Sequence, residues 1–173
     1  MRRLRFLLGL GILSLVGTAF AAGSTTVVVP AAVFLTDTTV AVLPGTALIV
    51  TAAGRWDVCN GNCPSGPDGA TNGDLGFCIG GLPAGELLGS LDGATFFAIG
   101  SGPTKVTGSG ELSLGPNDCA YYPDNSGELT ATVIVYPISK DACKDGGWQN
   151  LSRQDGTAFK NQGNCVSYVN TGK

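Results

Sequence analysis

The chain has 173 residues, six cysteines, no histidine and a formal net charge of −3, and 13% of its residues are charged, against a usual share of about one quarter. The lack of histidine excludes a Ser-His-Asp triad, a Cys-His pair and any His-ligated zinc or haem. The 27 glycines and nine prolines are typical of a turn-rich β protein, and the hydrophobic share of 43% argues against disorder.

The first segment has the pattern of a secretory signal peptide. Residues 1–5 are basic, residues 6–16 are apolar, and Ala19-Phe20-Ala21 fits a small-x-small cleavage site. The apolar run is short for a membrane span of about 20 residues. We therefore expect residues 1–21 to be removed and the remainder to be secreted or held at the cell surface, with no transmembrane segment.

The exported part then carries 7 basic and 13 acidic residues, a net charge of −6. Such a chain repels phosphate backbones, so nucleic acid is not an expected partner, and neither is an anionic membrane surface. Acidic loops that concentrate cations are compatible with this charge.

Short apolar, β-branched runs between Gly, Pro, Asn and Asp clusters predict strands and frequent turns. Strands are expected at residues 25–29, 32–35, 38–43, 47–52, 86–91, 95–99, 103–106, 111–114 and 128–136, with a long loop at 55–76. No stretch shows sustained helical periodicity with caps. The pattern predicts an all-β, antiparallel β-sandwich over residues 22–136, ended by Pro137, which cannot continue a central ladder.

Residues 137–173 form a polar tail that contains Cys143 and Cys165. These two cysteines are the natural local pair, and closing a loop of about 22 residues would contribute about 3 kcal/mol. The other four cysteines are Cys59, Cys63, Cys78 and Cys119. In an oxidising compartment they favour disulfides of undetermined pairing, with a zinc site as the alternative.

The densest polar cluster lies between the strands at 111–114 and 128–136. Asp118, Asp124 and Asn125 place three oxygen-bearing side chains in one connection, and calcium prefers such oxygen ligands. The alternative is a plain turn, because these residue types also form turns. The long loop at 57–74 likewise fits either a functional loop or a disulfide-stapled surface loop.

Two other side-chain types have a functional and a structural interpretation. Trp56 and Trp148 could stack on a sugar, but core filling is the commoner role. Paired carboxylates for glycoside hydrolysis could come from Glu86, Glu111 and Glu128, yet each of them opens a predicted strand, where a charge needs no function.

Several segments occur in the same order as in a known family. They are FLTDT (34–38), PGTALIVTAAGRW (44–56), GPDG (66–69), GLPAGELLG (81–89), FFAIGS (96–101), GELSLGPND (110–118) and DNSG (124–127). Together they resemble the PA-IL-like family of secreted, calcium-dependent, galactose-binding bacterial lectins. The tail is similar to a Cys-containing tail that ends many exported bacterial proteins.

The resemblance implies a β-sandwich of the galactose-binding jelly-roll type and a non-catalytic lectin for a galactose-type carbohydrate or glycoconjugate. It implies a calcium ion held by the side chains of Asp118, Asp124 and Asn125 and by the carbonyls of Tyr121 and of a residue near Val58. Asp118 and Asp124 would also contact the sugar, together with Thr71, Asn72 and Asp74, which stand where the founding lectin uses His and Gln. The alternative is a structural or adhesive cell-surface module without sugar binding.

Overall fold

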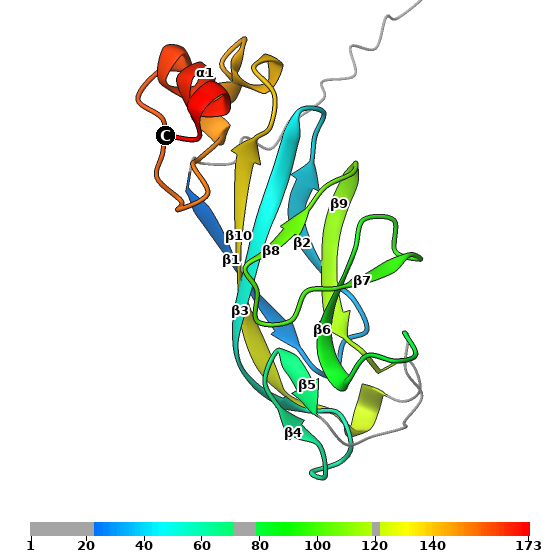
Figure 1. Cartoon of the computed structure of the whole chain (residues 1–173). Helices are drawn as coiled ribbons and strands as arrows, with labels where there is room; N and C mark the ends of the chain where they lie inside the picture. The colour runs from blue at the N-terminus through cyan, green and yellow to red at the C-terminus, as the bar shows by residue number, and fades with distance from the viewer. Residues whose placement is uncertain (1–22, 71–78, 119–121) are drawn as a thin grey trace, which may run out of the picture.

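The structure is a computed structural model that describes residues 23–70, 79–118 and 122–173. Within these residues, ten strands form two five-stranded antiparallel sheets that pack face to face (Figure 1). The all-β sandwich expected from the sequence is therefore confirmed. The predicted signal peptide lies outside the described residues.

The first sheet has the strand order β1-β10-β3-β4, and β8 also pairs with β3. Its strands are β1 (Ser24–Pro30), β10 (Ser126–Pro137), β3 (Thr46–Asp57), β4 (Pro64–Ser65) and β8 (Thr104–Val106). The second sheet has the order β2-β9-β6-β5, and β7 also pairs with β6. Its strands are β2 (Thr36–Val42), β9 (Gly110–Pro116), β6 (Ala84–Ser90), β5 (Asp68–Ala70) and β7 (Phe96–Ala98).

The core lies between the two sheets and follows from alternation along the strands. In β10, Leu129, Ala131 and Val133 are buried, and the intervening Thr130 is exposed. Leu112 and Leu114 of β9 alternate in the same way and meet them from the second sheet. Removing this apolar surface from water supplies the main driving force for joining the sheets.

The longest pairing in the fold joins β3 to β10 over 12 residue pairs, from Thr46 opposite Pro137 to Asp57 opposite Ser126. Pro137 has no N–H to donate and stands at the end of the ladder. β10 thus ends one residue beyond the boundary at 136 suggested by the sequence.

The strand expected at residues 32–35 is wrong. These residues form the corner where the chain leaves β1 in the first sheet and enters β2 in the second, and Val33 N donates to Pro30 O (3.3 Å). The loop expected at 55–76 is also wrong in part. β3 continues to Asp57 because β10 begins early enough to pair with it, and β4 and β5 follow within the same stretch.

The tail packs against the end of the sandwich where β10 finishes (Figure 1). It contains η2 (Asp141–Cys143), η3 (Gly147–Asn150) and α1 (Gln162–Thr171). The helix contradicts the expectation that the chain has none. Asn161 caps its N-terminus by accepting from Asn164 N (2.8 Å), and Gly172 ends it in the left-handed region.

A disulfide joins Cys143 to Cys165, as the sequence predicts. Both cysteines are fully buried in a small cluster with Leu151 and Phe159, separate from the sandwich core. Backbone hydrogen bonds attach this unit to the sandwich, among them Ser152 N to Val135 O (2.9 Å). In the described part of the chain, no helix is long and apolar enough to span a bilayer.

We expect a Cys143→Ser/Cys165→Ser variant to lose protection in the tail while the sandwich stays folded. The disulfide closes a 22-residue separation. Without it the unfolded tail regains conformational entropy, so the tail loses about 3 kcal/mol of stability. Hydrogen exchange of the amides of α1 measures this, with Cys59→Ser/Cys63→Ser as the control. Unchanged exchange in α1 would show that the disulfide does not hold the tail.

Candidate functional site

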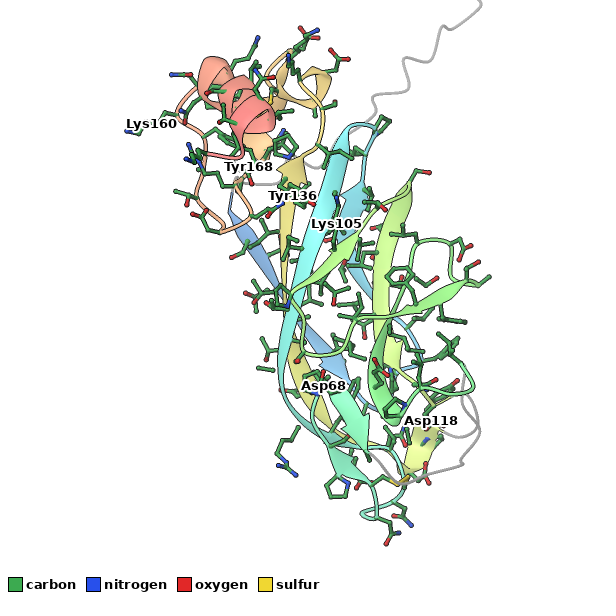
Figure 2. All side chains as sticks on the ribbon, in the orientation of Figure 1. Asp68, Lys105, Asp118, Tyr136, Lys160 and Tyr168 are labelled. Carbon is green, nitrogen blue, oxygen red and sulfur yellow. A yellow bond between two sulfur atoms is a disulfide. The ribbon has the colours of Figure 1, made fainter. Side chains whose placement is uncertain are left out.

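The cluster of predicted calcium ligands lies at the end of the sandwich opposite the tail. Asp57 ends β3 and pairs with Ser126, the first residue of β10. Val58, just after β3, and Asn125, just before β10, therefore adjoin neighbouring strand ends. Figure 2 shows Asp118 at this end, far from Lys160 and Tyr168 of the tail. One end of the β3–β10 ladder thus brings together segments that are far apart in the sequence.

Asn125 is the centre of the hydrogen bonding at this end. It is 7% exposed, and its Nδ2 donates to Asp118 Oδ2 (2.8 Å) and to Ala31 O (3.1 Å). Both bonds fix the direction of the amide, so its Oδ1 faces elsewhere. This buried Oδ1 has no hydrogen-bond partner in the described part of the chain.

A second unpartnered oxygen belongs to the next residue back. Asp124 closes the short helix η1 (Tyr122–Asp124), and its Oδ1 is buried with no hydrogen-bond partner among the described residues. A buried polar atom without a partner costs about 1–3 kcal/mol, and more when it is charged. Two such oxygens on consecutive residues, beside the buried carboxylate of Asp118, are a donor set that a cation would satisfy.

The acidic side chains alone are too few for a conventional metal cluster. Among residues 23–70, 79–118 and 122–173 there is no group of three His, Cys, Asp or Glu side chains that could hold an ion. A cation at Asp118, Asp124 and Asn125 would therefore need the amide oxygen and backbone carbonyls as well, which is compatible with calcium.

Asp57 has a structural role that the sequence analysis did not identify. Its Oδ1 accepts from Cys59 N (2.9 Å) and Gly61 N (2.7 Å), and its Oδ2 accepts from Cys63 N (2.9 Å). An aspartate just before an Asn-Gly turn is the one sequence signal that could have indicated this role. The carboxylate shapes the loop that directly follows Val58.

The same loop is closed by a disulfide between Cys59 and Cys63. The zinc alternative is therefore wrong for these two residues, because their sulfur atoms are bonded to each other and cannot be thiolate ligands. Val58 is buried and packs with Cys63 and Ala84. Its backbone carbonyl is thus the group with which it could contact an ion.

Asn117 was also missed, and it anchors the segment at residues 79–83. It is fully buried; its Oδ1 accepts from Ile79 N (3.0 Å), and its Nδ2 donates to Pro83 O (3.1 Å). No sequence pattern marks this contact, which spans 38 residues. Four predicted site residues lie outside the described residues: Tyr121, Thr71, Asn72 and Asp74.

Tyr122 lies beside the predicted ligands and is affected by them. Partial burial, and then the negative charge of Asp118, raise the pKa of the Tyr122 hydroxyl. Its ring packs against that of Phe34, with a centroid separation of 5.3 Å. The neutral phenol therefore borders the site with an apolar surface.

The three glutamates considered for glycoside hydrolysis lie in different strand pairs. Glu86 of β6 is opposite Asp68 of β5, and Glu128 of β10 is opposite Arg55 of β3. The pKa of Glu111 is raised by the charge of Asp37. Each of the three glutamates therefore has a different neighbour on an adjacent strand, and none is opposite another of the three.

The two tryptophans fill apolar clusters, as core-filling residues do. Trp56 is 2% exposed in the main core, and its Nε1 donates to Gly85 O (2.8 Å). Trp148 packs against the apolar cluster of the tail.

No protein-family model matches the chain. No curated protein matches it. Among solved structures, the chain is similar to one described as "EclA N-terminal domain; PllA-like lectin", with 24% sequence identity and a TM-score of 0.49, over 62% of this chain and 92% of that chain.

We expect Glu86→Gln to raise the melting temperature at neutral pH. Burial, and then the charge of Asp68, raise the pKa of Glu86 above its ordinary value of 4.5. The folded chain thus holds this proton more tightly than the unfolded chain, and the resulting stabilisation is complete below pH 4.5 and is lost as the pH rises through the raised pKa. Melting curves across this range should show a flatter profile for the variant; parallel profiles would contradict the assignment.

Proposed function

We propose that the protein is an exported, non-catalytic, carbohydrate-binding protein that takes a galactose-type sugar through a calcium ion. The observation that carries the proposal is the pair of buried, unpartnered oxygens, Asp124 Oδ1 and Asn125 Oδ1, beside the buried Asp118. Export is supported by the signal-peptide pattern of residues 1–21 and by the Cys59–Cys63 and Cys143–Cys165 disulfides.

The described donors fit calcium in type and charge. Asp118 and Asp124 supply carboxylates, Asn125 supplies an amide oxygen, and the backbone near Val58 supplies a carbonyl. Calcium takes six to eight oxygen ligands of these kinds. The carbonyl of Tyr121, which the resemblance adds to the set, belongs to the same connection.

The chain's own residues would hold the ligands in place before binding. The Asn125 amide is fixed by its bonds to Asp118 and Ala31, so its free oxygen needs little reorganisation. When bound, calcium supplies coordination positions that two adjacent sugar hydroxyls can take in exchange for water. Asp118 and Asp124 could then also accept hydrogen bonds from those hydroxyls, and Thr71, Asn72 and Asp74 could select the epimer.

A structural or adhesive module without sugar binding is the second candidate. One observation favours it: the Asp118–Asn125–Ala31 hydrogen bonds also tie the β9–β10 connection to the corner after β1. This linkage stabilises the end of the sandwich whether or not a ligand binds. Calcium without any sugar binding would support this candidate.

We expect Asp124→Ala and Asp118→Ala to lose calcium binding but to differ in stability without calcium. Asp124 Oδ1 is a buried oxygen without a partner, so its removal should leave the melting temperature in chelator unchanged or higher. Asp118→Ala removes the acceptor of Asn125 Nδ2 and should lower the melting temperature in chelator. Calorimetric titration with calcium and melting curves with calcium or chelator measure both effects.

For the parent protein, calcium at 100 times its Kd should add about 2.7 kcal/mol of stability, because it binds the folded loop. Identical melting curves in calcium and in chelator would show that no such site exists.

Galactose should bind weakly, with a millimolar Kd, and only in the presence of calcium. The loop that carries Thr71, Asn72 and Asp74 has no His or Gln, and each lost hydrogen bond costs about 0.5–1.5 kcal/mol, which is up to about tenfold in affinity. A glycan array with and without calcium measures this. A blank array together with tight calcium binding would favour the structural module over the lectin.

A further inference from the structure

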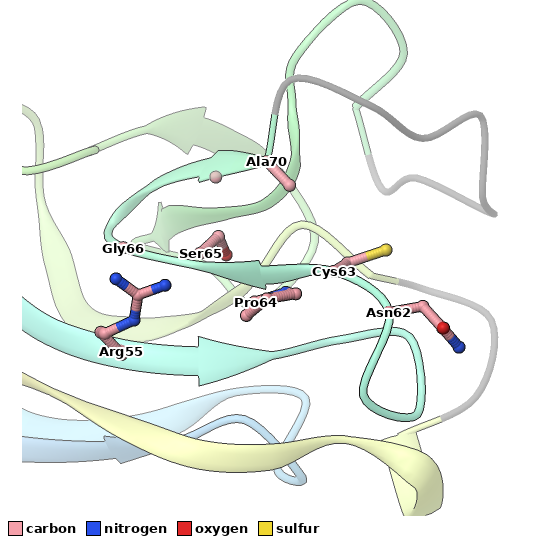
Figure 3. A pocket seen from close by; sticks show the side chains of 8 residues that line it. Arg55, Asn62, Cys63, Pro64, Ser65, Gly66 and Ala70 are labelled. Carbon is pink, nitrogen blue, oxygen red and sulfur yellow. The ribbon is translucent and has the colours of Figure 1, made fainter.

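A hollow of about 440 Å³ opens between the end of β3, β4 and β5. Figure 3 shows it, with Arg55 rising from β3 next to Gly66 and with Asn62 and Cys63 at its other end. Its size is within the range of small-molecule sites, about 300–1,000 Å³. Apart from Arg55, its lining comes from the loop at 57–74, and none of the predicted calcium or sugar ligands lines it.

We propose that this hollow is a second saccharide subsite that accepts a sugar residue bearing a carboxylate, with Arg55 as its cationic partner. The inference rests on the proposed function in that the neighbouring sugar would be the one held at the calcium site. It adds a substrate class, acidic glycans, to that function.

The guanidinium of Arg55 is available to bind an anion. It is exposed, and no described residue lies within hydrogen-bond or ion-pair distance of its guanidinium. Glu128 stands directly across the ladder, yet the two side chains form no salt bridge. The planar guanidinium can donate two parallel hydrogen bonds to a carboxylate, which gives such a pair both strength and direction.

The remaining lining suits a sugar ring. Asn62 Nδ2 already donates to Cys59 O (3.1 Å), which leaves its Oδ1 to accept from a hydroxyl. Pro64 and Ala70 add apolar surface for the C–H face of a ring. Ser65 is 5% exposed, and its Oγ has no hydrogen-bond partner among the described residues. Donor, acceptor and apolar surface therefore line one hollow.

The hollow is linked to the candidate calcium site through Val58, whose carbonyl is one of the expected ligands. The loop closed by Cys59–Cys63 has Val58 at its start and Asn62 at its far side. A Cβ built on Gly85 would lie 3.0 Å from the Val58 side chain and 3.1 Å from Ser65 Oγ, so the two residues face the same glycine. Neighbouring residues of one glycan chain could therefore occupy both places.

The test compares galactose-terminated disaccharides whose second residue is glucose, glucuronate or a sulfated glucose, by calorimetric titration in calcium. Free glucuronate is titrated separately in chelator, so that the hollow is probed without the calcium site. We expect the glucuronate disaccharide to bind better than its neutral counterpart, and Arg55→Gln to lower its affinity about tenfold without changing that of the neutral disaccharide. The difference should shrink in high salt, because Arg55 is exposed.

Lys105→Gln is the matched control, since it removes the same charge from the exposed face of β8, away from the hollow. The proposal is overturned if neither glucuronate nor the acidic disaccharide responds to Arg55→Gln, or if Lys105→Gln has the same effect. A gain with sulfate but not glucuronate overturns the carboxylate assignment.

The two proposals fail in different ways. Calcium-dependent binding of the neutral disaccharide with no gain from a carboxylate rejects the hollow and leaves the lectin function standing. Binding of free glucuronate that depends on Arg55, without any response to calcium, rejects the calcium site and leaves the hollow standing.

Discussion

The register between β3 and β10 is the constraint on which the rest of the structure depends. Twelve consecutive pairs run from Thr46 opposite Pro137 to Asp57 opposite Ser126. A slip of one residue would turn Leu129, Ala131 and Val133 out of the core. The same slip would move Asn125 away from Val58 at one end and displace the start of the tail at the other. The core therefore fixes the position of a polar cluster that contributes little apolar burial itself.

At the end of the sandwich that holds the candidate site, some polar side chains maintain the structure and others remain available to a ligand. Asp57 accepts from three backbone N–H groups, and Asn117 holds residues 79–83, so both are engaged in maintaining the structure. Asp124 and Asn125 each keep a buried oxygen without a partner in the described chain. A fold tolerates such atoms where a bound ion repays their desolvation, which is why they indicate a ligand more strongly than composition does.

The sequence predicted the sandwich and most of its strands, because alternation and turn residues are local signals. It failed at residues 32–35, where an apolar run crosses between sheets, since local pattern does not report which sheet a residue joins. It missed α1, whose apolar positions Cys165, Tyr168 and Val169 have helical spacing over a single turn and depend on packing and a disulfide for stability. It also missed Asn117, whose role comes from neighbours distant in sequence.

The basic side chains are distributed unevenly between the two ends of the β3–β10 ladder. Five of the seven basic residues of the exported part lie in the tail: Lys140, Lys144, Arg153, Lys160 and Lys173. Lys144 is paired with Asp141, and Arg153 is held over the rings of Phe159 and Tyr168. A ladder of 12 pairs is about 40 Å long, several times the Debye length of about 8 Å at physiological salt. The tail's cations therefore neither neutralise Asp118 and Asp124 nor compete with a cation there. Of the described basic residues, Arg55 lies closest to that end along the ladder, two positions before Asp57.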